Sequence, residues 1–237
     1  MIDVRQHITN GYSGRYPLDP TAVIGIAIHH SVSGGHFYDE LPDTQDDEIF
    51  HLRVIDQYHV EQGWGGFGYH LAAFPSGRWY YCGDLTGARA HVASRNYELI
   101  GVVLIGDFSA NVPPLLQMEA AREAVAFVRQ TYPGRSIAPH REWALPQYPT
   151  ACPGDTYQEW VPFLEPLASE EDDMLDVIKG DQRNEVYVLA PSGRKVHILD
   201  PAHLQALLDN GFVRDNAIRT IPQAQMEAIP DASGSYL

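Results

Sequence analysis

The sequence predicts an α/β fold, in which buried strands alternate with helices along most of the chain. Two runs, 22–28 and 99–105, are short, almost wholly apolar and rich in β-branched residues, which is typical of buried central strands. Residues 116–132 instead repeat their apolar side chains at helical spacing, so we expect an amphipathic helix there. Strand and helix patterns of this kind follow one another from residue 22 to residue 167.

The remaining elements are predicted in chain order from the same patterns. A helix is expected around 49–55, and turn residues at 75–78 separate two short strands, 71–74 and 79–82, that we interpret as a hairpin. A short strand leads into Pro139, and a last helix is expected over 156–167.

The chain of 237 residues is long enough for one well-buried domain and a small second one. We expect the first domain to span residues 1–168, because the charged run that follows has little apolar character. Residues 169–175 are then a linker, and residues 176–237 form a small C-terminal domain. That region contains a predicted hairpin, 185–189 with 195–199, and a helix start at 201–208.

Charge and composition exclude several classes of protein. The formal net charge of −15 leaves too few basic residues for a general nucleic-acid binder. No apolar run approaches the roughly 20 residues of a membrane-spanning helix, so no membrane insertion is expected. The first residues lack a charged segment followed by an apolar stretch, so no secretory signal peptide is expected.

Metal-type ligands stand where predicted strands end. His29 and His30 follow the apolar run at 22–28, His140 follows another short strand, and Cys152 lies in a proline-rich loop. Two imidazoles and one thiolate suit zinc, and three protein ligands leave a fourth position for water, as in catalytic sites. These residues are far apart in sequence, however, and spacing alone does not tie them together.

Six stretches in one order carry a resemblance to a known family. They are IAIHHS at 26–31, GWGGFGYH at 63–70, AH at 90–91 with Asn96, IGVVLIGD at 100–107, PHR at 139–141 and TACPGD at 150–155. In these stretches the chain resembles the zinc-dependent N-acetylmuramoyl-L-alanine amidases of the phage-endolysin and peptidoglycan-recognition-protein type (amidase type 2). The resemblance implies a mixed central β-sheet flanked by helices, with one zinc ion per chain at the end of the sheet.

The resemblance also implies a set of site residues. The metal ligands fall on His29, His140 and Cys152. The family's catalytic tyrosine falls on Tyr69, whose hydroxyl would donate to the oxygen that becomes negatively charged during amide cleavage. Thr150 stands where relatives have a lysine or a threonine that assists in the same way.

Substrate contacts are expected from four further residues. His91, in a block that contacts substrate in relatives, is expected to line the groove together with Asn96. Trp64, in the glycine-rich loop, is interpreted as a groove wall or a packing residue. His30 is predicted to be either a substrate contact or a residue that packs behind the ligands, since neighbouring side chains on a strand point to opposite faces.

The activity implied by the resemblance is hydrolysis of the amide bond between N-acetylmuramic acid and L-alanine in bacterial peptidoglycan. The chain is expected to act as a monomer, made in a host cytoplasm and released onto the cell wall as a phage endolysin, or otherwise to act extracellularly. The C-terminal region would serve in cell-wall targeting, in oligomerisation or as a passive cap.

Two alternatives stand beside the amidase. The first is a peptidoglycan-binding module of the same fold without catalysis, although such modules lose the cysteine that this chain keeps. The second is a cysteine hydrolase in which Cys152 and His140 form a nucleophilic pair. Sensitivity to a chelator separates a metalloenzyme from a thiol enzyme.

Overall fold

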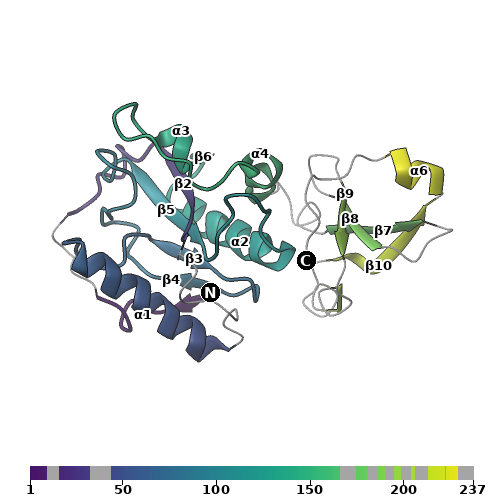
Figure 1. The fold of residues 1–237 in the computed structure, drawn as a ribbon, viewed down its shortest axis with the longest axis horizontal. Coiled ribbons are helices and arrows are strands. Elements are labelled where there is room, and N and C mark those ends of the chain that lie inside the picture. The colour runs from purple at the N-terminus through teal and green to yellow at the C-terminus, as the bar shows by residue number, and fades with distance from the viewer. Residues whose placement is uncertain are drawn as a thin grey trace. The chain divides into compact units, whose positions relative to one another are not determined.

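The computed structural model describes residues 1–9, 16–32, 44–165, 175–180, 186–189, 195–198, 204–205, 213–221 and 223–228. The chain divides into two compact units, Met1–Glu165 and Pro166–Leu237. Figure 1 shows the first unit as a sheet with helices beside it, and the second as a smaller sheet with a short helix. The part of the chain that the structure describes contains no helix with the length and apolarity that crossing a membrane requires.

A six-stranded mixed sheet forms the centre of the first unit. Its spatial order is β1-β4-β3-β5-β2-β6, and all neighbouring strands run parallel except β3 and β4. The strands are β1 (Ile2–Asp3), β2 (Gly25–His30), β3 (Leu71–Ala73), β4 (Trp79–Tyr81), β5 (Leu99–Leu104) and β6 (Ser136–Pro139). Every residue of β2 and of β5 is buried, as expected for two central apolar strands. The predicted fold class and the predicted hairpin are therefore confirmed.

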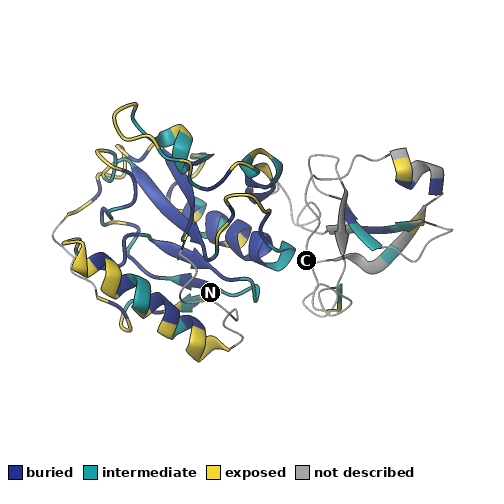
Figure 2. Ribbon diagram, in the orientation of Figure 1, coloured by how far each residue is buried: buried dark blue, intermediate teal, exposed yellow. Residues whose placement is uncertain are grey.

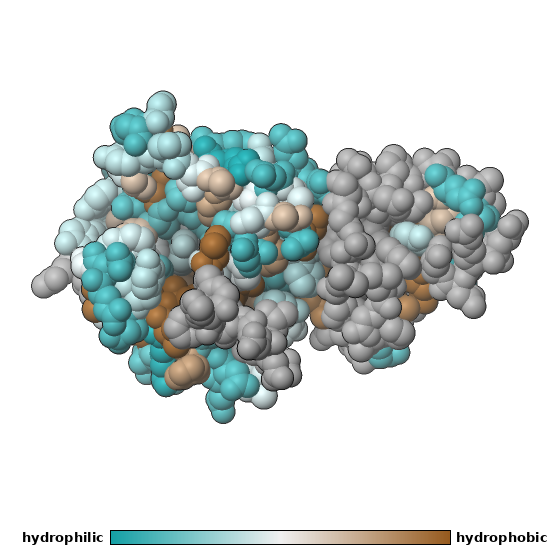
Figure 3. Space-filling view, viewed as in Figure 1, coloured by the Kyte–Doolittle hydropathy of each residue, from teal (hydrophilic) through white to brown (hydrophobic). Residues whose placement is uncertain are grey.

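Two long helices cover the sheet. Helix α1 (Gln45–Glu61) packs through Leu52 against one face, where Val103 and Phe74 belong to the same apolar cluster. Helix α2 (Leu115–Thr131) contacts β3, β4 and β5, and it buries Met118, among other residues. Figure 2 shows exposed residues along the outer side of α1 and buried residues through the sheet. In Figure 3, hydrophilic and hydrophobic residues are mixed over the visible face of this unit.

A buried carboxylate fixes the start of α1 on the sheet. Thr44 caps the helix by accepting a hydrogen bond from the backbone N–H of Asp47. Glu48, fully buried in the next turn, accepts hydrogen bonds from Ser76 and Tyr80 and pairs with the Arg78 guanidinium at 2.6 Å. All three donors belong to the β3–β4 hairpin and its turn, and together they compensate the buried carboxylate.

Three short elements depart from the prediction. The expected helix over 156–167 is instead α4 (Tyr157–Trp160) followed by the 3₁₀ turn η1 (Val161–Leu164), with residues 166 and 167 outside the described part. Pro162 explains the break, because proline has no backbone N–H to bond to the preceding turn of an α-helix. The two-residue strand β1 and the single-turn helix α3 (His140–Trp143) are too short for a periodic pattern to reveal.

The second unit contains a four-stranded sheet in the order β10-β7-β8-β9. Strands β8 (Val186–Leu189) and β9 (Lys195–Ile198) pair in antiparallel fashion, which confirms the hairpin predicted there. Strands β7 (Leu175–Gly180) and β10 (Val213–Ile221) and helix α6 (Gln223–Ala228) complete the described elements. The predicted linker lies outside the described residues except for residue 175, which begins β7. Of the helix predicted at 201–208, only residues 204–205 are described.

Candidate metal centre

The register of two parallel strands brings His29 and His140 together. Ile28 of β2 lies opposite Pro139 of β6, and the next residues are His29 in β2 and His140, the first residue of α3. Side chains at matching positions of neighbouring strands share one face of the sheet, about 4.8 Å apart. Accordingly, the two imidazole ring centroids are 4.5 Å apart. His29 is buried and His140 is half-buried.

Cys152 reaches the same place from a loop that Arg141 holds. The backbone N–H of Arg141 donates to the Cys152 carbonyl oxygen at 3.0 Å, and its guanidinium donates to the Ala151 carbonyl oxygen and, at 3.1 Å, to the Asp155 carboxylate. Within the loop, the Thr150 hydroxyl accepts a hydrogen bond from the Cys152 N–H at 3.1 Å. Arg141, the residue directly after the candidate ligand His140, therefore fixes the loop that carries the candidate ligand Cys152.

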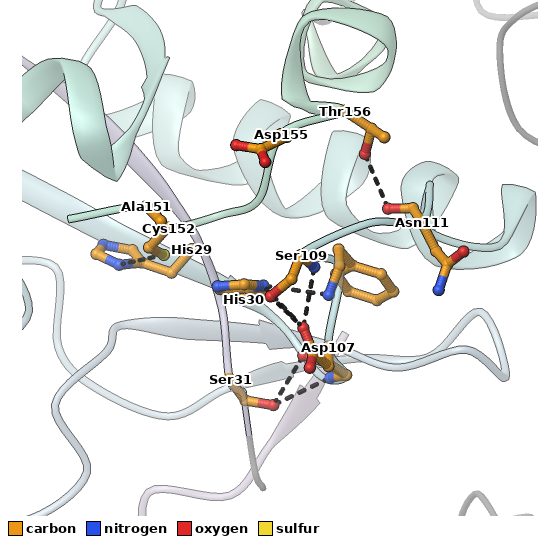
Figure 4. Close-up of polar contacts among 12 residues, drawn as sticks. His29, His30, Ser31, Asp107, Ser109, Asn111, Ala151, Cys152, Asp155 and Thr156 are labelled. Atoms are coloured by element: carbon orange, nitrogen blue, oxygen red, sulfur yellow. Dashed lines mark hydrogen bonds and ion pairs between the residues drawn. The ribbon is translucent and has the colours of Figure 1, made fainter.

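The same loop packs closely on the segment that follows β5. Gly154 has φ +112°, and a Cβ built on it would lie 1.8 Å from the Phe108 carbonyl oxygen. Just beyond it, the Asp155 N–H donates to the Ser109 carbonyl oxygen. The Thr156 hydroxyl donates to the Asn111 carbonyl oxygen. Figure 4 shows Cys152 beside His29 at one end of this loop. Glycine is required at position 154 because any side chain would push the loop away.

The three side chains fit a single metal ion. One ligand atom from each of His29, His140 and Cys152 lies within 4.8 Å of the other two. The Cys152 Sγ is 3.8 Å from the His29 Nδ1. A tetrahedral ion held at about 2.1 Å from nitrogen and about 2.3 Å from sulfur separates these atoms by about 3.6 Å. The distance between the Cys152 Sγ and the His29 Nδ1 needs only a small contraction, and three ligands leave one position open.

Burial sets the protonation of these ligands. It lowers the pKa of His29 well below its usual range, and the nearby His140 and His91 rings add to this effect. The pKa of His140 falls to about 4 for the same reason. Burial raises the pKa of the Cys152 thiol to about 12, although the backbone N–H of His30 and the Arg141 charge oppose the rise. The imidazoles are thus neutral and ready to bind a cation, whereas the thiol becomes a thiolate only when a cation displaces its proton.

Tyr69 stands beside the cluster at the end of a row of rings. Its ring centroid is 5.0 Å from that of His29 and 5.7 Å from that of His59. The His59 ring in turn lies 4.7 Å from the indole of Trp64, which is 42% exposed. Burial raises the pKa of the Tyr69 hydroxyl, and the neighbouring Cys152 adds to the rise, so the hydroxyl keeps its proton and acts as a donor. The row leads from the surface to the three ligands.

The structure gives His91 and Asn96 hydrogen-bonding roles inside the fold. His91 was expected to line a groove, but it is only 8% exposed and both ring nitrogens are engaged inside the fold. Its Nδ1 lies 3.1 Å from the His29 Nε2, and its Nε2 lies 3.1 Å from the Leu99 carbonyl oxygen. The Asn96 side-chain oxygen accepts hydrogen bonds from the backbone N–H groups of His91 and Val92. Both residues therefore support the site from behind.

His30 lies on the opposite face of β2 from His29 (Figure 4). It is buried, and its Nδ1 accepts a hydrogen bond from the Phe108 N–H at 3.1 Å. Of its two predicted roles, the geometry favours packing behind the ligands. Sequence reasoning assigned no role to His59 or Arg141. Arg141 stands next to a ligand, which is a signal that could have found it; a helical histidine such as His59 carries no such signal.

Comparison with known proteins gives one family and several relatives. A family model described as N-acetylmuramoyl-L-alanine amidase matches residues 19–155. An endolysin of Enterobacteria phage K11 is 33% identical over 124 residues, which are 50% of this chain and 80% of the relative. An endolysin of Escherichia phage T7 is 32% identical over 115 residues, 46% of this chain and 73% of the relative. Peptidoglycan-recognition protein LB of Drosophila melanogaster is 30% identical over 133 residues, 54% of this chain and 53% of that protein.

Solved structures share the fold. Drosophila peptidoglycan recognition protein SA has a TM-score of 0.55 at 20% identity, over 67% of this chain and 90% of that one. Wild-type Drosophila peptidoglycan recognition protein LB has a TM-score of 0.50 at 24% identity, over 65% of this chain and 86% of that one. At these identities the likeness concerns the fold alone.

The metal-free protein is expected to lose stability in mild acid. Burial lowers the pKa of seven histidines below the usual 6.5, and they are His29, His30, His51, His59, His70, His91 and His140. Below pH 6.5 the unfolded chain binds protons at these positions, whereas in the folded chain most stay neutral until about pH 4. The free energy of unfolding therefore falls with falling pH, by up to about 1.4 kcal/mol per pH unit for each histidine.

Urea unfolding of the metal-free protein at several pH values between 7.5 and 4.5 measures this dependence. We expect a progressive loss of stability that begins near pH 6.5 and unfolding without denaturant before pH 4. A free energy of unfolding that stays constant down to pH 4.5 would contradict the burial of neutral imidazoles.

Proposed function

Because the chain belongs to the N-acetylmuramoyl-L-alanine amidase family, we propose that it is a zinc-dependent peptidoglycan hydrolase. It cleaves the amide bond between N-acetylmuramic acid and L-alanine. The observation that carries the proposal is the convergence of His29, His140 and Cys152, with the Tyr69 ring beside His29. Two nitrogens and one sulfur around an open fourth position are the donor set of a catalytic zinc site.

The three ligands would each hold zinc through one atom, with Cys152 as thiolate. When bound there, zinc supplies a Lewis acid and a water nucleophile active at neutral pH. The rest of the chemistry falls to this chain's own side chains. The imidazoles of His29 and His140 are neutral, so the Cys152 thiolate would be the one negatively charged ligand. The ion would therefore keep part of its positive charge.

Tyr69 and Thr150 would stabilise the negative charge that develops on the scissile carbonyl oxygen. The Tyr69 hydroxyl stays protonated because burial raises its pKa, so it has a proton to donate at any working pH. The Thr150 hydroxyl accepts from the Cys152 N–H and keeps its own proton free for donation. Trp64, exposed at the outer end of the ring row, would contact the sugar or peptide of the substrate.

Relatives of the chain include proteins named as phage endolysins. This likeness supports an action on the bacterial cell wall as a phage lysin. A cysteine hydrolase is the weaker candidate, because such an enzyme needs a lowered thiol pKa, whereas burial raises that of Cys152 to about 12. A cation bound at the cluster would displace the thiol proton, so Cys152 would act as a thiolate ligand.

Digestion of purified peptidoglycan tests the proposal. We expect one zinc ion per chain, and release of L-alanine amino ends without new reducing sugar ends. A chelator should abolish the release, and added zinc should restore it. Cys152→Ser is expected to lose both zinc and activity, because a neutral hydroxyl replaces the only anionic ligand. Cys82→Ala, at the buried cysteine away from the cluster, serves as the matched control and should keep both.

Two outcomes would overturn the proposal. Release that persists in chelator would indicate a thiol enzyme. Binding of peptidoglycan without zinc and without release would make the chain a recognition module of the same fold.

A second variant tests the role of Tyr69. Tyr69→Phe removes one donor from the site while it keeps the ring against His29, so we expect kcat to fall by a factor on the order of 10² to 10³ with zinc content unchanged. Tyr97→Phe removes an exposed hydroxyl elsewhere and should have no effect. Full activity in the Tyr69 variant would refute the assigned role.

A further inference from the structure

We propose that His91 is a positioning residue that fixes the tautomer of His29, so that the Nδ1 lone pair of His29 faces the metal position. Two hydrogen bonds of the structure carry this inference. The consequence for zinc rests on the proposed function. His91 would then act through His29 and would touch neither the ion nor the substrate.

The direction of the first hydrogen bond is settled by the backbone. The Leu99 carbonyl oxygen lies 3.1 Å from the His91 Nε2, and a carbonyl oxygen only accepts. The proton of the His91 ring is therefore on Nε2. The ring is buried, and in a neutral imidazole with its proton on Nε2 the Nδ1 carries a lone pair.

The second hydrogen bond follows from the first. The His91 Nδ1 lies 3.1 Å from the His29 Nε2, so a lone pair on His91 requires a proton on His29. A neutral imidazole has one N–H, which leaves the His29 Nδ1 unprotonated. That atom lies 3.8 Å from the Cys152 Sγ, within the proposed ligand set. The opposite tautomer would set two lone pairs against each other at 3.1 Å and would point an N–H at the cation.

The fold makes room for the His91 ring at one position. A Cβ built on Gly101 of β5 would lie 2.8 Å from the His91 Cγ and 2.9 Å from its Nδ1. Residue 101 pairs with Ala27 of β2, two positions before His29. The ring therefore lies directly over Gly101 of β5. Asn96 holds the backbone of residues 91 and 92 in place, as described above.

Nuclear magnetic resonance on the full-length protein tests the tautomer directly. Long-range ¹H–¹⁵N correlation spectra of the metal-free protein at pH 7.5 report which nitrogen of each histidine carries the proton. We expect His29 with its proton on Nε2 alone. In His91→Phe, which keeps the ring volume but removes both hydrogen bonds, we expect a mixture of the two His29 tautomers. Gly101→Ala should act in the same direction by displacing the His91 ring.

Zinc affinity, measured by competition with a chelating dye, gives the second readout. His91→Phe should weaken zinc binding by about 10- to 100-fold, which is the usual effect of removing a hydrogen-bond partner of a ligand. His51→Phe is the matched control. His51 is also buried and lies against Phe74, away from the ligands, so its variant should bind zinc as the wild type does.

Three results distinguish the possible failures. A wild-type His29 with its proton on Nδ1 overturns the inference. Reduced stability of His91→Phe and Gly101→Ala, with the His29 tautomer and the zinc affinity unchanged, also overturns it and reduces His91 to a packing residue. A wild type with the expected tautomer that binds no zinc supports the tautomer assignment and overturns the proposed function instead.

Discussion

The parallel pairing of β2 with β6 is the constraint on which the site depends. Because Ile28 lies opposite Pro139, the residues that follow, His29 in β2 and His140 at the start of α3, lie side by side. No side-chain contact is needed to bring the two imidazoles together, since the backbone ladder does so. A shift of one residue in this register would send one of the two rings to the opposite face.

Everything else at the site completes or supports this pair. Arg141, immediately after one histidine, ties down the loop that delivers Cys152, and Gly154 lets that loop approach the segment after β5. Behind the pair, His91 bonds to His29 and to the backbone of β5. Burial keeps these rings neutral, which suits them to a cation and also makes the metal-free protein sensitive to acid. The burial of neutral imidazoles thus affects both the stability of this protein and its proposed chemistry.

Much of this arrangement could be predicted from the sequence. Apolar runs that end in histidine indicate strands that deliver side chains to an edge, and the helical periodicity of α2 is plain. The strand order could not be derived from periodicity, because the pattern of a buried apolar run does not indicate which strands lie beside it. The resemblance to a family supplied the link between His29, His140 and Cys152 that spacing could not.

His91 shows most clearly why sequence reasoning fell short. A histidine in a polar loop is expected at the surface, and nothing near it in the sequence indicates otherwise. Its burial depends on the absence of a side chain at Gly101, ten residues later in a central strand, and on Asn96, which turns the loop inward. Such a fit between a loop and a strand becomes visible only when both are placed in space.

X-ray absorption spectroscopy of the zinc-loaded protein reports the atoms around the ion and therefore shows whether His29, His140 and Cys152 bind it together. We expect one sulfur at about 2.3 Å and three lighter atoms at about 2.0–2.1 Å, which are two imidazole nitrogens and one solvent oxygen. A zinc shell without sulfur would rule out this set of ligands, because it would place the ion away from Cys152.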